Sequence, residues 1–203
     1  MEIMTSPYLN IAPSNWLPVT ESLIAKHPLT EQNLIDATLN SWASIFNSMF
    51  GTAGFKIGTH IYPKPQIMGF LLHELIPLEL ESMFKSEWHV DNTTSEKDCV
   101  CVADNSFSFE IKTSSDRNKV FGNRSFSQAT TKGKKAKDGY YLTVNFEKFK
   151  DSQNPKIRII RFGWLDSSDW RGQKAATGQQ SNLPPEVYAG KLKTIYSAYK
   201  IVC

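Results

Sequence analysis

The stretch EKDCVCVADNSFSFEIKTSS, residues 96–115, places Asp98, Glu110 and Lys112 among residues that otherwise have the composition of two buried strands. Charged side chains are costly to bury, so a fold keeps them inside only with partners. Two carboxylates held about 4 Å apart repel by about 4 kcal/mol at an effective dielectric near 20, and must share a proton or a cation. Such a site of hard oxygen ligands suits Mg²⁺, and a lysine beside it can position or deprotonate a water. The chemistry open to these residues is metal-assisted hydrolysis of a phosphodiester.

A hairpin is the element that must bring these residues together. CVCVA (99–103) and FSFEIKT (107–113) are rich in strand formers, and DNS (104–106) is typical of a turn. With that turn, the numbers of opposite residues sum to about 210, which sets Asp98 against Lys112 and Val100 against Glu110. Asp104 falls at the tip, ~15 Å along the strand from the cluster. The alternation therefore predicts that Asp98, and not Asp104, belongs with Glu110 and Lys112. The opposite face packs, and it carries Cys99, Cys101, Phe109 and Ile111.

The spacing of this cluster resembles that of the PD-(D/E)xK nuclease superfamily: Asp98, eleven residues, then Glu110-Ile111-Lys112 on the second strand of a hairpin. No proline precedes Asp98, which departs from the name of the motif. In that superfamily a helix before the hairpin often adds another acid. Here Glu74, in the apolar run GFLLHELI, is the candidate, because a metal would explain a carboxylate buried there. The alternative is a glutamate at the helix edge, paired with His73 or solvent; the lesser candidates are Glu79 and Glu81.

The resemblance to the superfamily covers about residues 66–165, and two further segments add to it. The runs FGNRSFSQ…KKAKDGYYLTVNFEKF and RIIRFGWLDSSDWRGQKAATGQQ look like those of prokaryotic type II restriction endonucleases, and the second is similar to the ScaI-like group. This resemblance implies a Mg²⁺-dependent homodimer that cuts both strands of a palindromic duplex and leaves 5′-phosphate and 3′-hydroxyl ends. A two-fold site calls for a two-fold protein. In a restriction-modification system the enzyme would be paired with a DNA methyltransferase.

The remaining pattern predicts one α/β domain over residues 1–203, with a central mixed sheet flanked by helices. Residues 30–49 read as an amphipathic helix opening at Thr30, and 62–66 as a turn. Residues 67–84 read as a buried helix that Pro77 kinks or ends. Residues 139–149 and 156–165 read as strands, and Pro185 to Tyr199 as a helix. The nuclease core is expected over about 66–165, and a recognition loop with the C-terminal helix over about 166–203.

Basic and amide side chains supply candidate contacts to DNA. A basic run between Lys112 and Lys137 suits phosphates, although a solvated loop is the plainer interpretation. The polar stretch 170–182 offers side chains that reach two groups on one base edge, although it also fits an ordinary surface loop. The phosphate candidates are Lys119, Arg124, Lys132, Lys134 and Lys135, and the base-reading candidates are Arg171, Gln173, Lys174, Gln179, Gln180 and Asn182.

Composition sets the bounds of this interpretation. The chain has 203 residues, 40% of them hydrophobic, without an apolar run of roughly 18 residues or a basic-then-apolar start. We therefore expect a protein of the cytoplasm that does not associate with membranes, and the resemblance to restriction endonucleases implies that the cell is prokaryotic. Cys99 and Cys101 are expected to be core thiols, and the four histidines supply no paired zinc motif. The five tryptophans are expected to pack in the core or at an interface: Trp16, Trp42, Trp88, Trp164 and Trp170.

Three functional hypotheses fit these observations. The first is the site-specific endonuclease. The second is a repair, recombination or mobile-element nuclease of the same fold, which cuts without a defined sequence. The third is a non-catalytic DNA-binding module, in which the acid-lysine cluster is only an ion pair worth ~0 to 1 kcal/mol. A plasmid digest separates the first from the second, and DNA binding without metal-dependent cleavage would favour the third.

Overall fold

Six strands form the central sheet in the order β1-β2-β3-β5-β6-β9, within a computed structural model that describes residues 5–127, 136–175 and 177–199. Strands β3 and β5 pair in parallel and the other neighbours are antiparallel, which confirms the predicted mixed sheet. The predicted strands near 139–149 and 156–165 are confirmed as β5 and β6. The bounds are β1 Trp88–Val90, β2 Cys99–Cys101, β3 Phe109–Ser114, β5 Gly139–Phe146, β6 Ile157–Leu165 and β9 Leu192–Ser197.

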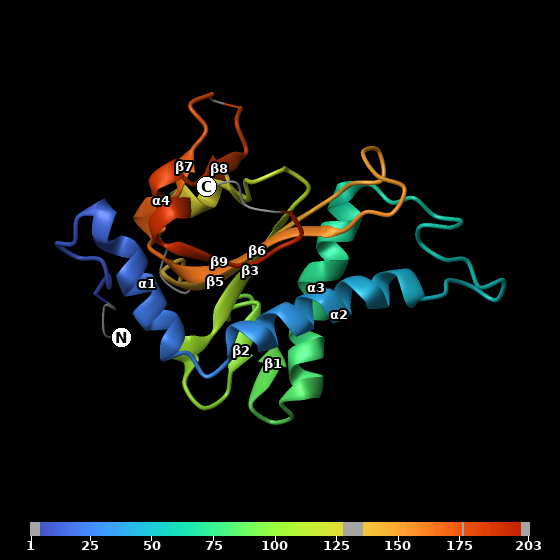
Figure 1. Ribbon diagram of the computed structural model, residues 1–203, viewed down its shortest axis with the longest axis horizontal. Helices are drawn as coiled ribbons and strands as arrows, with labels where there is room; N and C mark the ends of the chain where they lie inside the picture. Colours follow the sequence, from blue (N-terminus) through green and yellow to red (C-terminus); the bar gives the residue numbers. More distant parts are fainter. Residues whose placement is uncertain (1–4, 128–135, 176, 200–203) are drawn as a thin grey trace.

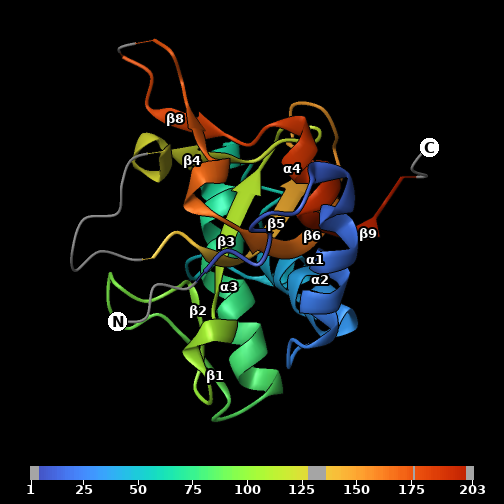
Figure 2. The same ribbon diagram turned by 90° about the vertical axis from the view of Figure 1, so that its left-hand side faces the viewer.

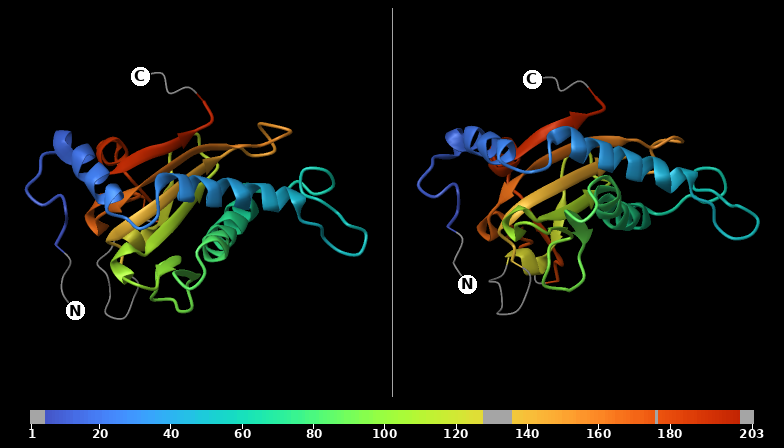
Figure 3. Two further views of the ribbon diagram at one scale, coloured as in Figure 1. Left: turned by 60° about the horizontal axis from the view of Figure 1, so that its bottom comes forward. Right: turned by 90° about the horizontal axis from the view of Figure 1, so that it is seen from below.

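Three helices lie on one side of this sheet: α1 (Trp16–Ala25, preceded by the 3₁₀ turn η1, Pro13–Asn15), α2 (Glu31–Asn47) and α3 (Pro65–Met83). Figure 1 shows α2 crossing α3, and Figure 3 shows α1 and α2 following one another along the sheet. The predicted helix at 30–49 is confirmed as α2. Thr30 caps it, because its hydroxyl accepts from Asn33 N (3.2 Å) and the Asn33 side chain accepts from Thr30 N (2.9 Å). Among the described residues, none of the helices is both long and apolar enough to span a membrane.

Pro77 lies inside α3 and does not end it, because the helix continues to Met83. Of the two expected effects of this proline, termination of the helix is therefore wrong. Proline lacks an N–H, and the carbonyl of His73 therefore receives no helical hydrogen bond from it. Ile76, Pro77 and Leu80 are all buried. Packing of this face on the sheet compensates for the missing bond, as tertiary contacts commonly override local preference.

The hairpin that carries the charged cluster has a different register from the one predicted. Cys99 is opposite Phe109, a sum of 208 and not 210, which sets Asp98 against Glu110. The connection is longer than the predicted DNS turn, because a 3₁₀ turn, η2 (Asn105–Phe107), follows Asp104. A change of two in the sum keeps every side chain on its face, whereas a slip by one residue would reverse them. The predicted division of faces therefore survives.

A second, smaller sheet and a short helix lie on the other side of the central sheet. The small sheet has the order β4-β8-β7, and Figure 2 shows β4 and β8 above β3. The segment 170–182, predicted as one long polar loop, thus contributes two strands. The helix predicted from Pro185 to Tyr199 is also wrong, since α4 ends at Gly190 and β9 follows. The bounds are β4 Phe121–Asn123, η3 Arg124–Ser127, η4 Ser167–Asp169, β7 Arg171–Gly172, β8 Gln180–Asn182 and α4 Pro185–Gly190.

The central sheet has a hydrophobic cluster on each of its two sides. The larger one joins the sheet to α2 and α3 and includes Phe109, Ile111 and both thiols of β2. The smaller one lies under the small sheet and α4, and it consists of Val120, Tyr141, Leu165, Trp170, Leu183, Val187 and Leu192. All five tryptophans belong to these clusters or pack against them, as predicted. Cys99 and Cys101 are free buried thiols, as expected, and Cys203 lies outside the described residues.

Candidate active site

The adjacent ends of β2 and β3 bring Asp98, Glu110 and Lys112 together. Lys112 Nζ lies 3.0 Å from Glu110 Oε2 and 4.0 Å from Asp98 Oδ2. The side chains of Asp98 and Glu110 are only 6% and 2% exposed, and that of Lys112 is 15% exposed. At this burial the electrostatic interaction between the three groups is stronger than it would be in water. The ammonium also lies 4.7 Å from the centre of the Phe126 ring, a cation-π contact.

The carboxylate of Asp98 is fixed by the backbone of the neighbouring strand. Its Oδ2 accepts a hydrogen bond of 2.7 Å from the N–H of Ile111, the residue between Glu110 and Lys112. A charge-assisted bond of this kind is about twice as strong as a neutral one. Asp104, by contrast, is exposed, and its Oδ1 accepts from Ser106 N (2.8 Å) at the start of η2. The structure thus brings Asp98 to the cluster and leaves Asp104 at the turn.

His73 of α3 is a fourth member of the cluster, whereas the sequence indicates it only as a partner of Glu74. Its Nε2 donates to Asp98 Oδ2 at 3.0 Å, and its Nδ1 lies 3.4 Å from Glu74 Oε1. The hydrogen bond to Asp98 raises the pKa of His73, against the opposing effect of burial. The sequence feature that could have indicated His73 is its position, since it is a polar residue one helical turn after Gly69 within an apolar run.

Glu74 is expected to be buried, but its side chain is 47% exposed and contacts His73. On this helix the residue that reaches the cluster is one position earlier, since successive residues of a helix point about 100° apart. Of the two lesser candidates, Glu79 accepts from the Ser44 hydroxyl of α2 (3.4 Å) and Glu81 is exposed. Any metal-binding role of Glu74 stays a prediction.

A close approach of α3 to β3 sets the position of His73. Thr113 Oγ1 donates to the carbonyl of Gly69 at 3.2 Å. A Cβ added at Gly69 would lie 2.7 Å from Thr113 Oγ1. Only a glycine permits this separation without a shift of the helix. Because His73 follows one turn later on the same face, the Gly69–Thr113 contact fixes the distance between the imidazole and Asp98.

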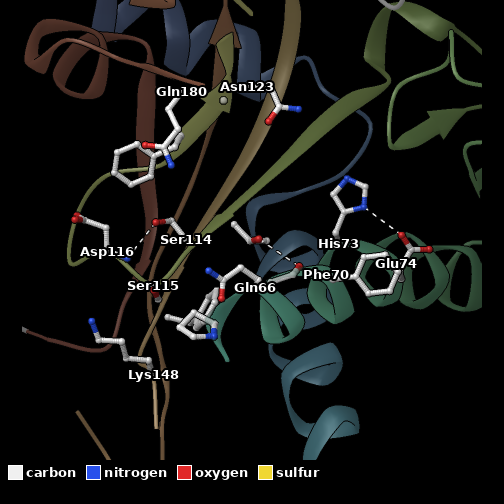
Figure 4. A pocket seen from close by; sticks show the side chains of 16 residues that line it. Gln66, Phe70, His73, Glu74, Ser114, Ser115, Asp116, Asn123, Lys148 and Gln180 are labelled. Atoms are coloured by element: carbon white, nitrogen blue, oxygen red, sulfur yellow. Dashed lines mark hydrogen bonds and ion pairs between the residues drawn. The ribbon is translucent and has the colours of Figure 1, made fainter. Parts of the chain in front are cut away.

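A cleft opens beside the cluster, between α3 and the small sheet. It consists of a cavity of about 820 Å³ and a smaller one of about 200 Å³, which share His73, Thr113, Phe121, Gly122 and Asn123. Lys112 lines the smaller cavity. Figure 4 shows Asn123 and Gln180 on one side of the larger cavity, with Gln66, Phe70 and His73 of α3 on the other. The reactive cluster is therefore next to a space bounded by polar side chains that differ from one wall to the other.

The predicted DNA-contacting residues are distributed between the cleft and other surfaces. Gln180 lines the cleft, whereas Arg171 is exposed and pairs with Glu186 (3.0 Å). The guanidinium of Arg124 donates to the carbonyls of Ala175 (3.2 Å) and Gly178 (2.9 Å) and thereby ties η3 to the loop before β8. Gln173, Lys174 and Gln179 are exposed on that loop and Asn182 is half-buried on β8, while Lys132, Lys134 and Lys135 lie outside the described residues.

Lys119 does not face the cleft. It lines a separate cavity on the other side of the loop that follows β3. This loop presents Asp116 to the cleft and Lys119 to the second cavity. The described part of the basic run therefore does not form one patch, because Lys119 lies at the second cavity and away from the cleft.

The donor set of the cluster fits Mg²⁺. Asp98 and Glu110 offer hard anionic oxygens, and the single charge of Lys112 is half of what their two carboxylates carry. Within the described ranges no group of three or more His, Cys, Asp or Glu side chains is arranged to hold a metal. Mg²⁺ commonly takes one or two carboxylates and completes its shell with water and phosphate oxygens, which matches a two-carboxylate site beside an open cleft.

Known proteins resemble this chain over most of its length. The model of the ScaI restriction endonuclease family matches residues 6–196. The Type II restriction enzyme ScaI of Streptomyces caespitosus is 52% identical over 195 residues, which cover 95% of this chain and 85% of that protein. No solved structure matches the chain.

Proposed function

The chain belongs to the ScaI restriction endonuclease family and is a type II restriction enzyme, and on that premise we propose that it hydrolyses both strands of a palindromic DNA site with Mg²⁺. The cleavage would leave 5′-phosphate and 3′-hydroxyl ends. The single observation that carries the proposal is the cluster of Asp98, Glu110 and Lys112 at the edge of the cleft.

In this proposal Asp98 and Glu110 hold the cation, and His73 keeps the Asp98 carboxylate in place through its 3.0 Å contact. When bound, Mg²⁺ acidifies a water and neutralises charge that develops on the phosphate. The ammonium of Lys112 is the one strong donor among the three core residues, so it orients the attacking water or a phosphate oxygen. Its contacts with Glu110 and the Ile111 carbonyl (3.2 Å) hold it at the mouth of the smaller cavity.

Two copies of the chain would act on one site, because a palindrome presents the same phosphodiester twice, related by a two-fold axis. The proposed assembly is a homodimer with one cluster for each strand. A DNA methyltransferase of the same specificity would protect the host sites. Since both would act on DNA inside a prokaryotic cell, we assign the enzyme to the cytoplasm.

Phosphate and base contacts would come from the cleft and from surfaces outside it. Lys132, Lys134 and Lys135 remain proposed phosphate ligands, together with Lys119 and Arg124. Among the proposed base-reading residues, which also include Arg171, Gln173, Lys174, Gln179 and Asn182, Gln180 has the strongest support, because it lines the cleft. Its amide offers a donor and an acceptor, the pair that reads an adenine edge.

Digestion of a mapped plasmid with Mg²⁺, followed by sequencing of the ends, tests the function. We expect discrete fragments with one sequence at every end. Lys112→Ala and Glu110→Gln should abolish cleavage and retain specific DNA binding, whereas the exposed Lys85→Ala should cut normally. A smear would indicate the non-specific nuclease, and binding without any metal-dependent cleavage would indicate the non-catalytic module.

Competition between duplexes tests the role of Gln180. Gln180→Ala should lose about 1 to 3 kcal/mol of binding free energy on the cognate duplex and little on a random one, since only the cognate duplex presents the matching base edge. Gln153→Ala removes the same amide from an exposed position that does not line the cleft, and it serves as the control. Equal losses on both duplexes would assign Gln180 to backbone binding.

A further inference from the structure

A second cavity, of about 800 Å³, is lined by four cationic side chains and, among the described residues, by no acidic one. It lies between the loop after β3, strands β6 and β9, and the start of α4. The four cations are Arg117, Lys119, Arg158 and Arg161, and the wall also carries the rings of Tyr188 and Tyr199 and the hydroxyls of Thr194 and Ser197. Clustered cations repel, so a fold that gathers them around a cavity is stabilised by an anion.

The cavity is on the same face of the sheet as the reactive cluster. Lys112 pairs with Thr143, and Thr143 pairs with Arg161, so Lys112 and Arg161 stand in one cross-strand row. Two strand spacings separate them, or roughly 10 Å of backbone. The loop 115–119 lies between the cleft and the second cavity, because Ser115 and Asp116 line the former and Arg117 and Lys119 line the latter. The two spaces are therefore neighbours and not one continuous site.

Arg161 is the residue that most requires an anion. It is half-buried, and its Nη1 donates to Asn145 Oδ1 at 3.0 Å. The guanidinium also lies 5.4 Å from the centre of the Tyr188 ring. Within the described part of the chain it has no carboxylate within ion-pair distance, and burial lowers its pKa. A guanidinium has five N–H donors, so the hydrogen bond to Asn145 leaves most of them for another acceptor.

The loop that completes the cavity is held in place by the same asparagine. Asn145 Nδ2 donates to the carbonyls of Asp116 (3.0 Å) and Lys119 (2.9 Å), while its Oδ1 accepts from Arg161. Asp116 Oδ1 in turn accepts from the N–H of Lys119 (2.9 Å). Arg117 and Lys119 are thereby presented on a braced backbone and not on a loose one.

The charge of the surroundings remains positive after its neighbours are included. Arg158 lies 3.5 Å from Glu147 Oε1 and 5.4 Å from the centre of the Tyr199 ring. Asp116, which faces the cleft, supplies the other nearby carboxylate. Two acids beside four cations leave a net charge of about +2, which attracts an anionic phosphate group.

We propose that this cavity binds a phosphate group distinct from the one that is cleaved. Guanidinium pairs recognise phosphate through parallel hydrogen bonds, and the hydroxyl of Thr194 can donate a further one. The phosphate is that of a DNA backbone outside the cleft or of a free phosphate compound. Both sources share this chemistry, and the two arms of the test distinguish them.

The first arm measures binding of inorganic phosphate to the full chain by calorimetry, without divalent metal. Wild-type protein should bind, and Arg117→Ala/Lys119→Ala should bind at least about tenfold more weakly, since two charge-assisted hydrogen bonds are removed. Both side chains are exposed, so the variant should fold. Lys26→Ala/Lys85→Ala removes the same charge from exposed positions that line neither cavity, and it should bind phosphate like wild type.

The second arm measures duplex affinity against salt, again without metal, so that its result is independent of cleavage. If the DNA backbone is the ligand, the Arg117/Lys119 variant should flatten the salt slope by about 0.9 for each phosphate that is no longer neutralised. If a free phosphate compound is the ligand, the slope should stay at the wild-type value while phosphate binding is abolished. Unchanged phosphate binding together with an unchanged slope would overturn the proposal. Failure of the proposed endonuclease function would appear instead in the plasmid digest.

Discussion

Asp98 is the residue on which the two halves of the site meet. One of its carboxylate oxygens accepts from the backbone of β3 and from the imidazole of α3. These two donors come from different elements, so the orientation of the carboxylate depends on how both are packed. The sequence could indicate Asp98 over Asp104 because strand alternation decides which side chains share a face. It could not indicate His73, since that contact depends on how closely a helix approaches a strand.

Exchange of a single oxygen for an amide separates the two aspartates. Asp98→Asn should keep the fold, because an amide oxygen can still accept from Ile111 N, but should weaken Mg²⁺ binding and slow cleavage by roughly two orders of magnitude or more. Asp104→Asn should leave the rate almost unchanged, since Asn serves the same turn. Single-turnover rates and thermal melting of both variants make the comparison. An inactive Asp104→Asn beside an active Asp98→Asn would contradict the assignment.

At the scale of elements, local pattern is a good guide to strands and a poor one to their partners. The sequence predicts a strand at 107–113, and β3 occupies 109–114. The register differs because η2 lengthens the connection, a turn that the residues DNS do not reveal. The register differs by two residues, an even number, so each side chain stays on its predicted face of the strand. For this reason the sequence still indicates the cluster.

The C-terminal segment differs from its prediction for a tertiary reason. The pattern of residues 185–199 predicts a continuous helix, but Lys191 is buried with its Nζ 2.7 Å from Asp166 Oδ2 and 2.8 Å from Asp169 Oδ1. A buried ammonium needs such partners, and the chain leaves the helix there to provide them. The following LKTIYS then pairs with β6. These partners come from elsewhere in the chain and cannot be read from the segment itself.

The contact between α3 and β3 gives a test at this scale. Gly69→Ala should displace the helix, because the added Cβ would meet Thr113 Oγ1 at 2.7 Å, and cleavage should fall as His73 moves from Asp98. Thr113→Ala in the same chain removes that oxygen and should restore most of the activity. Cleavage rates of the two single variants and the double variant form the cycle. Additive losses would mean that the separation of helix and strand does not position the imidazole.

At the scale of the whole molecule, stability depends on a neutral histidine in the main core. His27 is buried against the rings of Trp88, Phe107 and Tyr140, among others. Its Nδ1 accepts from Leu29 N (3.2 Å) and its Nε2 donates to the Phe107 carbonyl (3.0 Å), which uses both nitrogens of the neutral ring. Burial lowers the pKa of His27 below its ordinary value of 6.5.

This arrangement predicts a loss of stability in mild acid. Below pH 6.5 His27 binds a proton in the unfolded chain but stays neutral in the folded protein, where its pKa is lower. The free energy of unfolding should therefore fall as pH decreases, by at most about 1.4 kcal/mol per pH unit. Chemical denaturation between pH 7.5 and 5.5 measures it. His27→Gln, which does not titrate, should show a smaller decline. Identical pH profiles for the two proteins would exclude His27 as the cause.

The alternation along β3 also has an evolutionary meaning. Phe109 and Ile111 belong to the core, while Glu110 and Lys112 form the proposed catalytic cluster, and the two sets do not overlap. Selection can therefore act on one set and spare the other. A lineage released from the need to cut DNA could lose Glu110 and Lys112 together and keep its shape, and a surviving descendant would be a DNA-binding protein with the outline of a nuclease.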